Sequence, residues 1–190
     1  VAIKDGMISS ICSSGSLSCP EAEQTVDGSR LLWMPGLTDG HMHTCQQLLP
    51  GKILDALPMI WTRIMLPFEI TLTPEAVSLS AALCSLERIR GGTTSFLDAG
   101  GIHMDEAAKV YIKSGLRGAL TLSTMDDTKV PDSMRADAAE SISRLNEYYN
   151  TWNGSGDGRL SVYYSLRSLI SCSEELIRGV FEAASERSAM

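Results

Sequence analysis

The sequence has no hydrophobic run long enough to cross a lipid bilayer. Its longest apolar stretches, such as residues 56–65, are shorter than the roughly 20 apolar residues of a transmembrane helix, and polar residues interrupt them. Residues 1–11 lack the positively charged start and the long apolar segment of a secretory signal peptide. We therefore expect a cytoplasmic protein with no membrane partner.

Positive charge is also scarce. The chain has 16 Lys and Arg residues against 23 Asp and Glu residues, a formal charge of -7 at pH 7, and it contains no basic run. Nucleic acids and anionic membranes are bound by clustered Lys and Arg that displace counterions. The composition therefore argues against a nucleic-acid partner, while 44% hydrophobic residues in 190 suffice for a buried core.

Cysteines are few, and their spacing is not that of a disulfide scaffold. The five cysteines are odd in number and widely separated, without a CxxC pair, so we expect reduced thiols. Cys45 lies two residues after a pair of histidines and is a conceivable metal ligand. A small buried thiol is the favoured interpretation, because free cysteine is commonly buried.

Residues 1–34 read as a small, incomplete β-subdomain. Asp5-Gly6 forms a turn between two short apolar runs, which predicts a hairpin over residues 1–8. Further short strands are predicted at residues 24–26 and 31–33, on either side of Asp27-Gly28.

From residue 35 onward, predicted strands alternate with predicted helices. Thr73 and Pro74 are typical of an N-cap and a first helical residue, and this helix should end at Gly91-Gly92. The strands are predicted at residues 36–43, 93–97, 116–123 and 160–165, and the helices at residues 74–90, 105–114, 133–149 and 173–187. Four βα units with parallel strands fit the first half of an eight-fold α/β barrel better than a complete open sheet, which remains the alternative. Half a barrel leaves two strand edges unpaired, so we expect a piece of a longer protein.

Two of the three histidines, His41 and His43, are placed one residue apart at the end of the first predicted barrel strand. Residues i and i+2 of a strand point to the same face, so both imidazoles can reach one metal ion. Asp39 precedes His41 by two and should face the same side, where it can orient a metal ligand through a hydrogen bond or hold the turn. The carboxyl ends of barrel strands are where barrel enzymes keep their active sites. Two solvated histidines at a strand end are the alternative.

The context of this pair resembles a known signature. MPGLTDGHMH, residues 34–43, resembles the PG-(L/F)-(V/I)-(D/N)-x-HxH motif of the amidohydrolase superfamily, whose two histidines are metal ligands. Further matches to its deaminase and chlorohydrolase branch follow in order: LPMIW at 57–61, LPFE at 66–69, GGTTSFLD at 91–98 and SGLRGA at 114–119. The resemblance implies a partial β-sandwich over residues 1–34 and the first four βα units of a TIM-type barrel over residues 35–190.

Within this branch, two residues resemble those of guanine deaminases. Gln46 follows the histidine pair at their glutamine position, and Arg167 with SCSE at 171–174 resembles their purine-binding segment. An amide offers a donor and an acceptor, and a guanidinium offers a planar fork of donors, so the resemblance implies hydrogen bonds to an aminopurine. Other members have a histidine at the position of Arg167, which weakens an adenosine-type assignment. A salt bridge at the barrel rim is the alternative role for Arg167.

Three further residues have weaker signals. Trp61 lies where the resembling enzymes border their substrate pocket, and its ring can stack on a heterocycle or pack in the core. Asp98 and His103 lie at the carboxyl end of the second barrel strand. Asp98 can orient a metal ligand through a hydrogen bond or hold a loop, and His103 can reach the pocket or face solvent.

The resemblance implies a hydrolase that removes the amino group of a heterocycle such as guanine, with one divalent metal per chain. Zn²⁺ is favoured and Fe²⁺ is the alternative; the fourth strand ends without the lysine of dinuclear relatives. The resembling enzymes place their proton-transfer Glu and His and a late Asp beyond the equivalent of Met190, so the 190-residue chain alone is expected to be inactive. Homodimers are common among them. The rival interpretations are cyclic amide opening, triazine dechlorination and a non-catalytic truncated relative.

Overall fold

The computed structural model describes residues 1–13, 16, 20–49, 51, 53 and 57–189. Close contacts divide the chain into two units, Val1–Pro35 and Gly36–Met190. The division into the two predicted domains stays a prediction.

The described residues of the first unit include a hairpin. Strands β1 (Ala2–Lys4) and β2 (Met7–Ser10) pair in antiparallel orientation, and Asp5 and Gly6 between them both have positive φ, as a two-residue hairpin turn requires. The strands predicted at residues 24–26 and 31–33 are wrong: both segments are irregular, and their large apolar side chains are exposed. Short apolar runs form strands only against a partner, and the described part of this unit offers them none.

The second unit is built on a parallel four-stranded sheet in the order β3-β4-β5-β6. Its strands are β3 (Leu37–Met42), β4 (Thr93–Asp98), β5 (Arg117–Leu120) and β6 (Leu160–Val162). Its long helices are α2 (Pro74–Arg90), α3 (Met104–Ser114), α4 (Ala138–Trp152) and α6 (Glu174–Glu186). Strands that follow one another in the chain are neighbours in the sheet, which is the order a (β/α)8 barrel needs. The half-barrel itself stays a prediction.

Short helical segments connect these elements. They are η1 (Thr44–Gln46), η2 (Trp61–Met65), α1 (Leu66–Glu69), η3 (Asp132–Met134), α5 (Ser155–Gly158) and η4 (Leu169–Ser171). The π-helical η2 runs directly into α1, so the segment that begins at Trp61 ends at Glu69 without a break.

Helix boundaries follow the capping residues. The Thr73 side chain accepts a hydrogen bond from the backbone N–H of Ala76, Pro74 is the first helical residue and Gly91 is the C-cap, as predicted. The third long helix begins later than predicted, at Ala138 rather than residue 133. Its N-cap is Asp137, whose carboxylate accepts a hydrogen bond from the backbone N–H of Glu140. This bond satisfies a free N–H group of the first helical turn, so the helix begins after Asp137.

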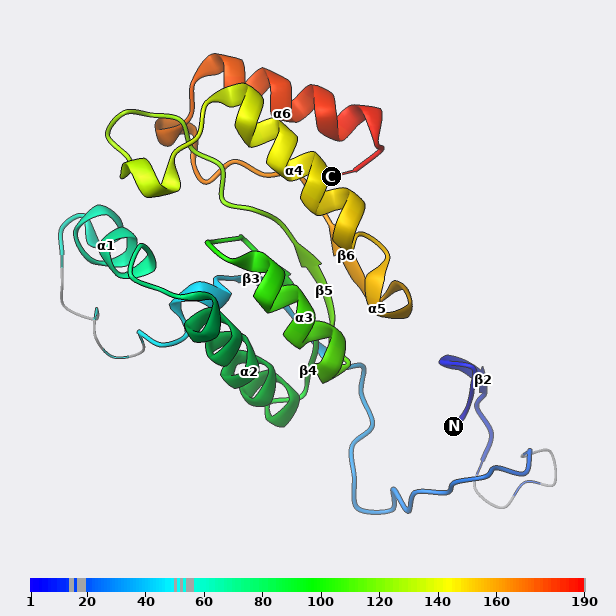
Figure 1. Ribbon diagram of the computed structural model, residues 1–190. Coiled ribbons are helices and arrows are strands. Elements are labelled where there is room, and N and C mark those ends of the chain that lie inside the picture. The colour runs from blue at the N-terminus through cyan, green and yellow to red at the C-terminus, as the bar shows by residue number, and fades with distance from the viewer. Residues whose placement is uncertain (14–15, 17–19, 50, 52, 54–56, 190) are drawn as a thin grey trace. The chain divides into compact units, whose positions relative to one another are not determined.

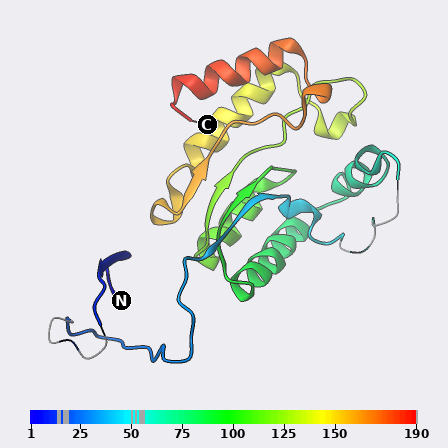
Figure 2. The same cartoon turned by 180° about the vertical axis from the view of Figure 1, so that it is seen from behind.

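The core lies between the sheet and its helices. Helices α2 and α3 cover one face of the sheet, as the opposite views in Figures 1 and 2 show. The buried side chains that fill this interface include Val77 and Ala81 of α2, Tyr111 of α3 and Phe96 of β4. A second cluster joins α4 and α6 through Leu145, Leu176 and Val180. The sheet that carries the strand ends is therefore held by packing against these helices.

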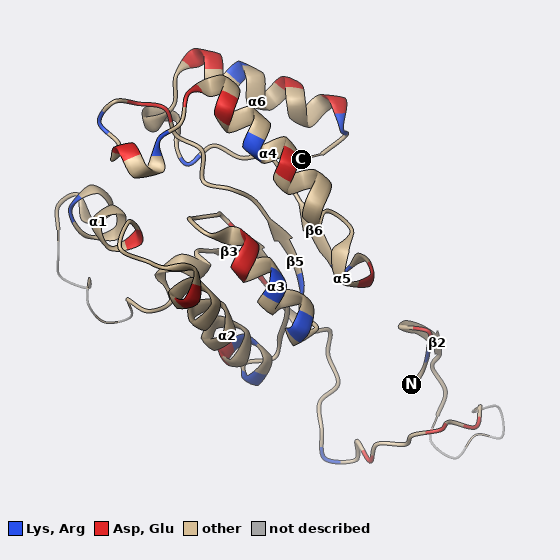
Figure 3. Ribbon diagram, in the orientation of Figure 1, with Lys and Arg blue, Asp and Glu red and all other residues tan. Residues whose placement is uncertain are grey.

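Charged side chains of both signs are spread over the chain, and its cysteines differ in state. Lys and Arg residues are scattered over several elements and alternate with acidic residues (Figure 3). No helix among the described residues is long and apolar enough to cross a membrane. Cys45, Cys84 and Cys172 are free thiols, as expected, but Cys12 is in a disulfide bond, which corrects the expectation of a fully reduced chain.

Candidate active site

A pocket of about 500 Å³ opens at the carboxyl end of the sheet. Five of the residues singled out from the sequence line it: His41, His43, Gln46, Trp61 and Arg167. Tyr163 and Ser165, which follow β6, complete the wall beside Arg167. The first and fourth strands of the sheet thus contribute to one concave site, although their residues are more than 100 positions apart in the chain.

A β-bulge at the end of β3 sets the direction of the histidines. Asp39 pairs with Phe96 and Met42 pairs with Asp98, so β3 has one residue more than β4 over this interval. Met42 is buried in the core, and His41 and His43 on either side of it line the pocket. The bulge also breaks the alternation on which the expectation for Asp39 rested. Asp39 does not line the pocket: its Oδ2 accepts from Nη2 of Arg88 on α2 at 2.7 Å, and its Oδ1 accepts from the backbone N–H of His41 at 3.2 Å.

The two imidazoles form a compact pair. Their ring centroids are 5.0 Å apart and their planes are nearly perpendicular, at 86°. Nδ1 of His43 lies 3.3 Å from the carbonyl oxygen of Gly100, so a proton on Nδ1 is held there and Nε2 keeps its lone pair. Burial, and then the nearby Arg167 guanidinium, lower the pKa of His43, against an opposing effect of the Gly100 carbonyl. A neutral ring is the form that binds a metal.

Asp98 holds the loop that supplies this carbonyl. It is fully buried, and its Oδ1 accepts a 3.0 Å hydrogen bond from the N–H of Gly100. The Thr44 hydroxyl donates to Oδ2 and is itself 2.6 Å from the Tyr111 hydroxyl. Burial raises the pKa of Asp98 to about 6, and these hydrogen bonds oppose the rise. Asp98 therefore acts on His43 through the backbone of Gly100, without lining the pocket.

Gly100 is required by the backbone at this point. Its φ is +79°, and a Cβ atom there would lie 2.8 Å from the carbonyl carbon of Leu122 and 2.9 Å from the nitrogen of Ser123. The loop after β4 passes directly over the chain after β5.

Glu69 is a site residue that the sequence reasoning missed. It appears in the LPFE motif, but nothing in that motif placed its side chain. In the structure it is completely buried, and its Oε1 accepts hydrogen bonds from Nε2 of Gln46 at 2.5 Å and from Nη2 of Arg167 at 2.9 Å. Its Oε2 has no hydrogen-bond partner among the described residues. The available signal was a charged residue at the end of a short apolar helix.

Arg167 is fixed from several sides. Nη1 donates to the Ser123 hydroxyl at 3.2 Å, and the guanidinium carbon is 6.0 Å from the Trp61 ring centroid. The backbone N–H of Arg167 donates to the carbonyl of Thr124. Arg167 forms a buried salt bridge with Glu69, and it also lines the pocket. The alternative role considered for Arg167, a salt bridge, is thus present, and substrate binding stays a prediction.

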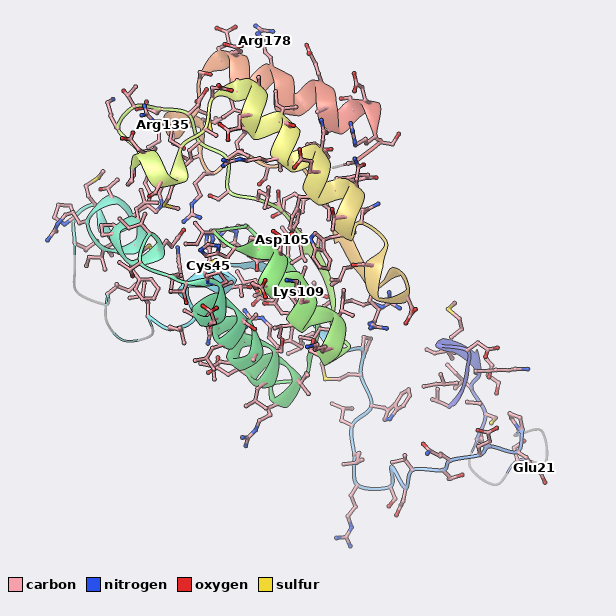
Figure 4. All side chains as sticks on the ribbon, in the orientation of Figure 1. Glu21, Cys45, Asp105, Lys109, Arg135 and Arg178 are labelled. Atoms are coloured by element: carbon pink, nitrogen blue, oxygen red, sulfur yellow. The ribbon has the colours of Figure 1, made fainter. Side chains whose placement is uncertain are left out.

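His103 lies away from the pocket. Its Nε2 is 3.2 Å from the carbonyl oxygen of Leu72, and it is the N-cap residue of α3. Cys45 lies within η1 and is labelled in Figure 4; it is fully buried, and burial raises the pKa of its thiol well above the ordinary range. Its Sγ lies 3.2 Å from the carbonyl oxygen of Ile102, and Cys45 does not line the pocket.

The donor set fits part of a metal site. Neutral imidazoles are good ligands for Zn²⁺ and Fe²⁺, and His41 and His43 supply two of them at one end of the pocket. Nowhere among the described residues do three or more His, Cys, Asp or Glu side chains gather as a metal site would need. A metal held here needs further ligands.

The amidohydrolase family model matches residues 32–190, which is most of the chain and includes every residue of the pocket. The chain belongs to the amidohydrolase family. The match begins just before the MPGLTDGHMH segment, so the signature read from the sequence lies inside it.

Two relatives found by sequence are named as deaminases. The chain is 32% identical to 5'-deoxyadenosine deaminase of Methanosarcina barkeri over 100% of its own length and 42% of that enzyme. It is 33% identical to 5-methylthioadenosine/S-adenosylhomocysteine deaminase of Acetivibrio thermocellus, over 97% of the chain and 41% of the relative. The chain thus spans about two fifths of the length of these curated relatives.

Solved structures share the fold at lower identity. Guanine deaminase from C. acetobutylicum, solved with guanine in its active site, matches with a TM-score of 0.73 and 22% identity, over 82% of this amidohydrolase chain and 38% of that one. Atrazine chlorohydrolase from Arthrobacter aurescens, complexed with zinc, matches with a TM-score of 0.65 and 15% identity, over 81% and 39%. At these identities the likeness is one of fold.

Proposed function

We propose that this chain forms the first part of the active site of a metal-dependent deaminase, which hydrolytically removes the amino group of a heterocycle such as guanine or a related aminopurine. The observation that supports the proposal most is the convergence of His41, His43, Gln46 and Arg167 on one pocket. A histidine pair is suited to a metal, and the two polar side chains beside it are suited to the edge of a planar ring.

His41 and His43 are proposed to hold a divalent metal, Zn²⁺ in preference to Fe²⁺. When bound, such a metal supplies Lewis-acid activation of water for attack on the ring carbon that carries the amino group. His43 contributes a neutral ring whose orientation is maintained by the Gly100 carbonyl and, behind it, by Asp98.

Gln46, Arg167 and Trp61 are proposed to bind the substrate. Arg167 offers N–H donors to ring carbonyls and ring nitrogens, and the Gln46 amide offers a complementary group. The Trp61 ring forms an apolar wall beside them, suitable for stacking on a heterocycle.

An adenosine-type nucleoside is the second candidate substrate. The observation that favours it is the set of sequence relatives, which are named for 5'-deoxyadenosine, 5-methylthioadenosine and S-adenosylhomocysteine. Arg167 favours guanine, because adenosine-type rings have no carbonyl to accept its hydrogen bonds.

The experiment is an ammonia-release assay on the zinc-loaded full-length protein. Guanine, 8-oxoguanine, pterins, adenine and 5'-deoxyadenosine are the test substrates, with a triazine and a cyclic amide for the rival chemistries. Ammonia from the oxo-substituted rings supports the proposal, and ammonia from 5'-deoxyadenosine alone supports the nucleoside alternative. Release of chloride or ring opening without ammonia refutes deamination. The 190-residue chain assayed alone is expected to be inactive, and no activity from the full-length protein favours a non-catalytic relative.

A further inference from the structure

We infer that Glu69 is a positioning residue that makes the pocket selective for a ring carbonyl beside a ring N–H; this inference rests on the proposed function. Glu69 is completely buried and does not line the pocket, yet both polar side chains proposed to bind substrate donate to the same oxygen of its carboxylate. It therefore acts on a substrate only through Gln46 and Arg167.

Glu69 decides which end of the Gln46 amide is offered to the pocket. An amide can present either its NH₂ or its oxygen, and both orientations have nearly the same shape. A carboxylate accepts hydrogen bonds and donates none, so Gln46 must turn its NH₂ toward Glu69, where Nε2 lies 2.5 Å from Oε1. The oxygen of Gln46 is then left as an acceptor.

Glu69 also fixes the donors of Arg167. The guanidinium donates one N–H to Oε1 of Glu69 at 2.9 Å and one to the Ser123 hydroxyl at 3.2 Å. A guanidinium has five N–H groups, so donors remain after these two bonds. Because the side chain is only 5% exposed and held at two points, these donors keep a constant direction.

The pocket thus combines an acceptor from Gln46 with donors from Arg167. The complementary edge has a donor N–H beside an acceptor carbonyl, which is the lactam edge of an oxo-substituted aminopurine or pterin. An adenine-type ring has no carbonyl, and it leaves the Arg167 donors facing ring nitrogen or nothing. An unsatisfied polar group in a desolvated site is the strongest source of discrimination between similar ligands.

The test is calorimetric binding of two probes to the zinc-loaded full-length protein. Hypoxanthine and unsubstituted purine differ by the lactam group, and neither has an exocyclic amine, so neither can be deaminated. The wild-type protein is expected to bind hypoxanthine more tightly. In Glu69→Gln the new amide can donate as well as accept, Gln46 is free to turn, and the preference for hypoxanthine is expected to fall about tenfold or more.

The chain offers a matched control. Gln47, the neighbour of Gln46, donates through Nε2 to Glu87 in an exposed pair of the same chemistry outside the pocket. Glu87→Gln is expected to leave the hypoxanthine preference unchanged. Glu69→Asp keeps a carboxylate that only accepts hydrogen bonds, but moves it away from Gln46 and Arg167 by one methylene group. The preference of this variant for hypoxanthine should therefore lie between those of the wild type and Glu69→Gln.

Each outcome decides the inference. A wild type without hypoxanthine preference overturns it, and so does an equal loss of affinity for both probes in Glu69→Gln, which a merely structural role would produce. If circular dichroism shows that Glu69→Gln is unfolded, an unchanged preference in Glu69→Asp overturns the inference and a reduced one supports it. Ammonia release from guanine is assayed separately: a selective but inactive protein contradicts the proposed deamination and leaves the positioning role of Glu69 supported.

Discussion

Nδ1 of His43 lies 3.3 Å from the carbonyl oxygen of Gly100, and the N–H of that same glycine donates to Asp98. A buried carboxylate is thereby connected to a pocket histidine through the backbone of one residue. The backbone of Gly100 thus orients the imidazole of His43. The orientation of this ring therefore depends on residues that do not line the pocket.

Replacing Gly100 with Ala is expected to disrupt this connection. The new Cβ would lie 2.8 Å from backbone atoms of the next loop, at a φ of +79°. We expect a loss of about 2–4 kcal/mol in the free energy of unfolding and a 10- to 100-fold weaker zinc affinity, measured by urea unfolding and by competition with a chelator.

Gly115→Ala is the control for this variant. Gly115 has the same φ of +79°, but a Cβ there would meet nothing within 4 Å. It should lose about 1–2 kcal/mol from backbone strain alone and keep its zinc affinity. Equal effects of the two variants would show that the close approach at Gly100 is unimportant.

Asp98→Asn is expected to change how stability depends on pH. Burial raises the pKa of Asp98 from 3.8 to about 6 in the folded protein, so between these values the folded state holds a proton that the unfolded state has lost. The contribution of Asp98 to stability is therefore fully present below pH 3.8, falls as the pH rises to about 6 and is then constant.

Urea unfolding of the wild type and of Asp98→Asn from pH 4 to pH 7 measures this contribution. The stability of the wild type relative to the variant should decrease by on the order of 1–3 kcal/mol over that range. A difference that is independent of pH would contradict the raised pKa.

His43→Gln is expected to reduce the zinc content of the full-length protein. The substitution removes one of the two proposed ligands, and metal analysis after dialysis should find well below one zinc per chain. His103→Gln is the matched control, since the His103 ring is 3.2 Å from the Leu72 carbonyl and does not line the pocket. Full zinc content in His43→Gln would exclude His43 as a ligand.

Arg167→Met is expected to destabilise the fold through Glu69. The side chains of this pair are only 5% and 0% exposed, so the substitution leaves a buried carboxylate without its cation. A loss of about 3–5 kcal/mol is expected. The double variant Glu69→Gln/Arg167→Met should lose less, because it buries no lone charge.

An exposed ion pair serves for comparison. The side chains of Arg178 and Glu174 on α6 are 72% and 77% exposed. Figure 4 labels Arg178 at the surface, and Arg178→Met should change stability by less than about 0.5 kcal/mol. If Arg167→Met costs no more than Arg178→Met, the buried pair has no structural importance.

Local sequence predicted the elements that depend on neighbouring residues. Thr73 and Pro74 begin α2, and Gly115 ends α3 with a positive φ, because capping and backbone freedom act within one turn of a helix. The hairpin at Asp5-Gly6 follows from the same kind of local rule. The four strands of the sheet were predicted close to their places, since alternating apolar and helical periods do not depend on distant contacts.

Contacts between distant residues decided the rest. The bulge in β3 arises from its pairing with β4. Asp39 pairs with Arg88 and accepts from the backbone N–H of His41, whereas strand alternation alone predicted that it faces the same side as the His41 ring. Glu69 and Arg167 are 98 positions apart, and only the tertiary fold brings their side chains together. The sequence by itself thus determined the elements, the family and the histidine pair, through short-range periodicity and motif. Only the tertiary structure decided which buried groups position that pair and its polar neighbours, because those hydrogen bonds join segments that the chain separates.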